Sequence, residues 1–130
     1  MTVCDIDNNQ ITVSRLAELD ALLMKRRSDG ANAFWLAHDG KQYPHLALLV
    51  KGELASVHYF PEDSDAGYIP SGNLAQLPVR EMSRFSISKH QADDVHVVND
   101  SVLPMSVAVQ VAREFFRSDA LPTAITWEKL

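Results

Sequence analysis

Hydrophobic residues recur along this chain with the spacing of a helix in two places and of strands in several others. Four leucines share one face of a helix expected over residues 15–27, namely Leu16, Leu19, Leu22 and Leu23. Ser14 is placed to cap the start of this helix, and Ser28-Asp29-Gly30 predicts its end. A second helix is expected from Pro104, with an apolar stripe of Val107, Ala108, Val111, Ala112 and Phe115.

Three strands are expected between the two helices, at residues 33–38, 44–51 and 53–60. The turn signals Asp39-Gly40 and Lys51-Gly52 join them into a meander. Further strands are expected at residues 80–88, 94–98 and 123–127. The predicted fold class is therefore α+β, an antiparallel sheet of five to six strands with two packed helices. Residues 1–130 are expected to form a single domain.

The periodicity fails over residues 61–78, where prolines and glycines interrupt a connection that is long for a compact domain. Acidic residues lie beside tyrosines here, and tyrosine is a common anchor in protein interfaces. A solvated turn and a protein-binding loop are both open interpretations of this segment. The candidate partner-binding residues are Tyr59, Glu62, Asp63, Asp65, Tyr68, Ser71 and Asn73.

The charge of the chain narrows the classes of partner. The formal net charge is −5, and direct binding of nucleic acid requires clustered lysines and arginines, so it is not expected. A basic protein partner fits this charge better. The N-terminus lacks the pattern of a signal peptide and the longest aliphatic run is too short to cross a bilayer, so we expect a cytoplasmic protein that does not enter membranes.

Candidate chemistry is sparse. Cys4 is the only cysteine, in a terminal segment expected to be loosely held, so no internal disulfide is possible. His45 and His58 lie on neighbouring expected strands, but no metal-ligand spacing accompanies them. No nucleophile motif or phosphate loop is present. We therefore expect no metal, no other cofactor and no catalysis. Four aromatic residues are expected to pack in the core: Trp35, Phe115, Phe116 and Trp127.

Several short motifs place residues 16–130 beside a known family. They are Tyr43-Pro44-His45-Leu46, the run from Leu54 to Phe60, Ala112-Arg113-Glu114-Phe115-Phe116, Leu121-Pro122 and the ending Ile125-Thr126-Trp127-Glu128-Lys129-Leu130. With these motifs the chain resembles the small immunity proteins of bacterial polymorphic and contact-dependent toxin systems, in particular the first-numbered family. That family includes the partners of cytosine deaminase toxins that act on DNA.

The resemblance implies a function for the chain. It would bind and neutralise a cognate toxin domain, a deaminase or a nuclease acting on nucleic acid, through acidic and aromatic contacts at or near the active site of the toxin. Residues 80–96 do not follow the family pattern, which leaves open whether they contribute to this surface.

Two alternatives from other classes remain. The first is a small ligand-binding or enzymatic α+β domain that uses the sheet face, with Ser56, His58 and Tyr59 as pocket residues. The second is a subunit of a homomeric assembly, joined along the strand that carries Trp127. The sequence leaves the oligomeric state open.

Overall fold

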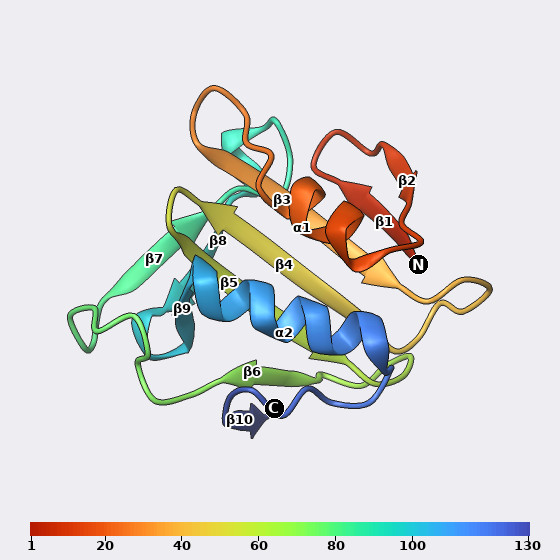
Figure 1. Ribbon diagram of the computed structural model, residues 1–130. Helices are drawn as coiled ribbons and strands as arrows, with labels where there is room; N and C mark the ends of the chain where they lie inside the picture. The colour runs from red at the N-terminus through yellow and green to blue at the C-terminus, as the bar shows by residue number, and fades with distance from the viewer.

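An eight-stranded antiparallel sheet carries both helices on one face (Figure 1). The computed structural model describes all 130 residues. The strands follow the order β10-β6-β5-β4-β3-β1-β2, and β9 pairs with β5 beside β6. The eight strands are β1 (Thr2–Asp5), β2 (Gln10–Thr12), β3 (Ala31–Ala37), β4 (His45–Lys51), β5 (Leu54–Phe60), β6 (Tyr68–Pro70), β9 (Val102–Pro104) and β10 (Trp127–Lys129). The α+β prediction is confirmed, with more strands than expected.

The centre of the sheet is the β3-β4-β5 meander, and its register assigns every side chain to one of two faces. Leu36 pairs with Leu46, which pairs with Tyr59, so these three form one row across the sheet. The next row on the same face contains Phe34, Leu48 and Val57. All six side chains are buried. Since strand residues alternate between faces, this is the face that forms the core beneath the helices.

The two helices cover this face and contact each other (Figure 1). Helix α2 (Met105–Arg117) buries Ala108, Val111, Ala112 and Phe115, which confirms the predicted stripe. Helix α1 (Leu16–Leu23) buries Leu19, Leu22 and Leu23 but is shorter than the expected 15–27. The Glu18 carboxylate accepts hydrogen bonds from the backbone N–H groups of Ser14 and Arg15, so Glu18 caps the helix and the prediction of a Ser14 cap is wrong.

The N-terminus is an integral part of the sheet. Strand β1 lies between β2 and β3, so Cys4 sits in an interior strand and the expectation of a loosely held end is wrong. The Met1 side chain is buried, and its ammonium group donates to the Val13 carbonyl oxygen at 3.0 Å. Strands of three or four residues carry too little periodicity to be recognised in the sequence. Here β1 is stabilised by pairing with β3, and β2 by pairing with β1.

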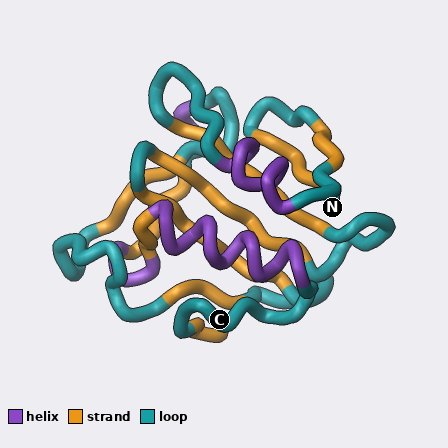
Figure 2. The backbone as a smooth tube through the Cα atoms, viewed as in Figure 1, coloured by secondary structure: helices purple, strands orange, loops and turns teal.

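A separate hairpin, β7 (Met82–Phe85) with β8 (Val95–Val98), lies outside the main sheet. Phe85 is buried but is not part of the helix-side core. Short 3-10 turns, Gln91–Asp93 and Asn99–Ser101, flank β8. The chain between β6 and β7 is loop throughout (Figure 2). Neither helix has the length and apolar character that crossing a bilayer requires.

The predicted aromatic packing divides into two groups. Phe115 is fully buried, whereas Phe116 and Trp127 are partly buried against the same core. The Trp127 indole N–H donates to the Pro122 carbonyl oxygen at 2.7 Å, which fixes the segment before β10. Trp35 is only partly buried and belongs to the opposite face of the sheet, because Leu36 beside it points into the core.

Adjacent phenylalanines provide a test of this core. Phe115→Ala should lower the free energy of unfolding by about 3–5 kcal/mol, because it empties a fully buried site. Phe116→Ala should lower the free energy of unfolding by only about 1–2 kcal/mol, since the partly buried Phe116 side chain removes less apolar surface from water. Urea unfolding of both variants measures the difference. Equal losses would contradict the assignment of Phe115 to the core centre.

Candidate protein-binding surface

The connection between β5 and β6, residues 61–67, is an exposed acidic loop. Glu62 and Asp63 are exposed and Asp65 is partly buried. Every ion pair of the molecule lies elsewhere, so no lysine or arginine is paired with these three carboxylates. The acidic loop therefore presents carboxylates that are free to pair with a partner.

Two features hold the acidic loop against β5, and one hydrogen bond within the loop adds to its order. The His58 Nε2–H donates to the Ala66 carbonyl oxygen at 2.7 Å, and the Asp65 Oδ1 accepts from the Gly67 N–H at 2.7 Å. Gly67 has a φ of 83°, and a Cβ added there would lie 2.4 Å from the Tyr59 carbonyl oxygen. Only glycine permits this approach of the loop to the strand. The carboxylates thus have a defined position beside the sheet.

The remaining predicted residues lie elsewhere. Tyr59 is 6% exposed and belongs to the core, where its hydroxyl donates to the Asp119 carbonyl oxygen at 2.8 Å. Burial raises the pKa of Tyr59 above its ordinary value. The Tyr68 ring is partly buried and packs edge-on against Tyr59, with centroids 6.1 Å apart. Since Tyr59 is enclosed in the core, its side chain is not available to a partner on this surface.

Ser71 and Asn73 follow β6 and are not part of the acidic loop. The Ser71 N–H donates to the Thr126 carbonyl oxygen at 3.1 Å. The Asn73 side chain closes a turn, because it donates to the Leu77 carbonyl oxygen and accepts from the Leu77 N–H. Both residues have structural contacts of their own, so the structure brings together only Glu62, Asp63 and Asp65.

Next to the acidic loop, four aromatic rings follow one another on the sheet face opposite the helices. The rings of His58 and Phe60 are stacked, with centroids 3.9 Å apart. The ring centroids of Phe60 and His45 are 4.7 Å apart, and those of His45 and Tyr43 are 5.0 Å apart. We call Tyr43, His45, Phe60 and His58 the aromatic row. The sequence analysis considered His45 and His58 as metal ligands and His58 as a pocket residue, but it did not connect them with Tyr43 and Phe60 as one surface.

Within the aromatic row, the imidazole of His45 favours its neutral form. Burial lowers the pKa of His45 below its ordinary value of 6.5, and the nearby His58 lowers this pKa further. A hydrogen bond with the Gln42 backbone acts in the opposite direction. A partner of this surface therefore meets aromatic area next to the carboxylates of the acidic loop.

The geometry also bears on the metal site and the pocket that the sequence left open. No three histidine, cysteine, aspartate or glutamate side chains are close enough to hold a metal ion. Ser56 and His58 lie on the helix-free face, whereas Tyr59 points into the core between sheet and helices. These three residues do not line one pocket, so the alternative pocket proposed from the sequence is wrong.

Gly67 tests how firmly the acidic loop is held. Gly67→Ala should reduce the free energy of unfolding by about 1–3 kcal/mol more than Gly40→Ala, because only the first adds a close contact. Gly40 has a φ of 75° and nothing within 4 Å of an added Cβ, so it shares the backbone strain without the clash. Denaturant unfolding compares the two variants, and equal costs would show that the loop yields freely.

His45 should make stability depend on pH. Because its pKa is lower in the folded chain, the unfolded chain binds the proton more readily, and stability falls as pH drops below about 6.5. His45→Gln should lose less unfolding free energy than the parent between about pH 7.5 and pH 5. Denaturant unfolding at both pH values measures this, and identical losses would contradict the burial of the neutral imidazole.

Comparison with known proteins agrees with the resemblance noted in the sequence. The family model described as Immunity protein Imm1 matches residues 7–129. A double-stranded DNA deaminase immunity protein from Burkholderia cenocepacia (strain H111) is 23% identical over 123 residues, which span 95% of this chain and 95% of that protein. The match covers nearly every element of the fold, and the chain therefore belongs to the Immunity protein Imm1 family.

Proposed function

We propose that this immunity protein neutralises a deaminase toxin that acts on nucleic acid, and that the acidic loop and the aromatic row form its toxin-binding surface. One observation carries the proposal: Glu62 and Asp63 are exposed and form no ion pair, on a loop that His58 holds beside the aromatic row. The name of the Burkholderia relative supports the toxin class.

The physical complement of this surface is a groove that binds nucleic acid. Such a groove needs lysines and arginines to neutralise phosphates. Carboxylates on the acidic loop can occupy the places of phosphates and accept charge-assisted hydrogen bonds from those cations. Opposite charges also steer the two proteins together and increase the association rate. The neighbouring rings supply apolar contact that water would otherwise cover, which slows dissociation.

In this proposal the chain inhibits by occupancy and not by catalysis. One molecule blocks one toxin domain in the cytoplasm of the cell that makes both. Neutralisation then requires slow dissociation, because a single released toxin molecule can modify many sites. A standard interface of about 1,600 Å² supports nanomolar binding or tighter when a few anchors are well buried.

A double charge reversal tests the acidic loop. Glu62→Lys with Asp63→Lys should slow association with the cognate toxin domain by about tenfold or more at low salt. Asp65 is left unchanged because its carboxylate holds the Gly67 N–H. The matched control, Glu81→Lys with Asp100→Lys, alters two exposed carboxylates outside the proposed surface and also moves the formal net charge from −5 to −1.

The readouts are association and dissociation rates at low and high salt, together with inhibition of cytosine deamination by the toxin. High salt should narrow the difference between the two variants, since it screens exposed charges. If both variants bind alike, the acidic loop is not part of the interface. A co-purifying toxin without activity on nucleic acid would refute the proposed toxin class.

A further inference from the structure

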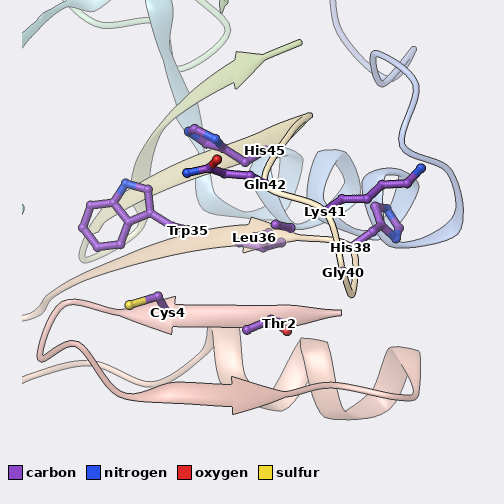
Figure 3. A pocket seen from close by; sticks show the side chains of 10 residues that line it. Thr2, Cys4, Trp35, Leu36, His38, Gly40, Lys41, Gln42 and His45 are labelled. Carbon is purple, nitrogen blue, oxygen red and sulfur yellow. The ribbon is translucent and has the colours of Figure 1, made fainter. Parts of the chain in front are cut away.

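The helix-free face of the sheet contains a shallow hollow of about 500 Å³ at the far end of the aromatic row (Figure 3). Its lining includes Trp35 on β3, Thr2 and Cys4 on β1, His45 on β4, and Lys41 and Gln42 from the β3-β4 loop. Figure 3 shows the Trp35 and Cys4 side chains on the same side of the sheet as His45. No role in the protein core accounts for a partly buried tryptophan at this position.

The hollow results from small residues between large ones in two rows of the sheet. One row contains Cys4, Trp35, Ala47 and His58, and the next contains Thr2, Ala37, His45 and Phe60. An alanine lies between larger side chains in each row, so the surface is lower there. Since helices cover only the other face, nothing from the chain fills this depression.

The lining of the hollow carries little free charge. The Lys41 ammonium is paired with the Asp119 carboxylate at 2.9 Å. The Thr2 hydroxyl donates to the Asp39 carboxylate at 3.0 Å, and Asp39 also pairs with the N-terminal ammonium. Burial lowers the pKa of His45, as described above. An uncharged apolar or aromatic group is therefore the occupant that this lining favours, because a buried charge would find no free counter-charge.

The aromatic row connects this hollow to the acidic loop without interruption. His45 lines the hollow, Phe60 contacts His45, and His58 stacks on Phe60. His58 in turn donates to Ala66 within the acidic loop. A protein bound to the carboxylates thus lies on a continuous surface that leads to Trp35.

We infer that the hollow receives one apolar or aromatic side chain of the toxin domain, carried on a segment whose basic residues meet the acidic loop. This inference rests on the proposed function, since it places the same partner on a larger surface. The acidic loop then governs how fast the complex forms. The hollow governs how long the complex lasts, because an anchor side chain buried against Trp35 must leave it before dissociation.

The single cysteine offers a direct test in the unmodified protein. Cys4 is partly buried and lines the hollow, so an inserted side chain should shield it from iodoacetamide. Alkylation of Cys4 should be at least about tenfold slower in the toxin complex than in the free chain, as expected of a group enclosed by an interface. The control protein, Cys4→Ser with Ser106→Cys, carries its thiol on the exposed side of α2. This exposed thiol should be alkylated at the same rate in the free chain and in the toxin complex.

A substitution pair measures the contribution of the anchor. Trp35→Ala should speed dissociation of the toxin by about 30-fold or more, the effect of losing a strong interface contact. Leu49→Ala shortens a partly buried residue of the same sheet face that does not line the hollow. It should change dissociation by less than about threefold. Circular dichroism tests whether each variant folds. If Trp35→Ala does not fold, the alkylation of Cys4 in the unsubstituted chain still tests the hollow.

The outcomes separate this inference from the proposed function. Full alkylation of Cys4 in a stable complex overturns the hollow as a binding site. If Cys4 is fully alkylated but the charge reversal in the acidic loop still slows association, the proposed function stands without the hollow. Shielding of Cys4 together with an ineffective acidic-loop reversal would keep the hollow and refute the acidic loop. Absence of any complex with the toxin refutes both.

Discussion

The register of the β3-β4-β5 pairing is the constraint on which the other features depend. A shift of one residue would exchange the two faces of each strand. Leu46, Leu48 and Val50 would then leave the core, and His45 and Ala47 would turn towards the helices. Such a shift is unfavourable because the helix-side residues are almost completely buried. The same alternation therefore builds the core and displays the opposite set of side chains on the helix-free face.

The acidic loop extends this logic beyond the strands. Gly67 brings the loop onto the Tyr59 carbonyl oxygen, and His58 fixes it through Ala66. Both contacts involve β5, so the position of the carboxylates follows from the register of the sheet. An inhibitor gains from this order, because little conformational freedom is left to lose on binding. Long-range charge and short-range aromatic contact then act from neighbouring parts of one surface.

Local patterns predicted the central parts of the fold and failed at its edges. The stripes of α2 and α1 and the β3-β4-β5 meander have strong periodicity, and the structure confirms them. Strand β1 has four residues and exists through its pairing with β3, which no local pattern reveals. For the candidate surface, the sequence marked the carboxylates of the acidic loop. It could not separate Tyr59 from them, because burial depends on which face the helices cover. The hollow could not be predicted either, because Cys4 lies beside Trp35 only through the pairing of β1 with β3, and β1 was not recognised in the sequence.

Amide hydrogen exchange of this chain, alone and bound to its toxin domain, tests the location of the interface most directly. Backbone amides that become enclosed by a partner exchange more slowly. We predict added protection in residues 61–67, in the β3-β4 loop and at the ends of β3 and β4 near it. The backbone amides of α2 should exchange at the same rate in the free and the toxin-bound chain. Protection concentrated on α1 and α2, with the acidic loop unchanged, would contradict the account.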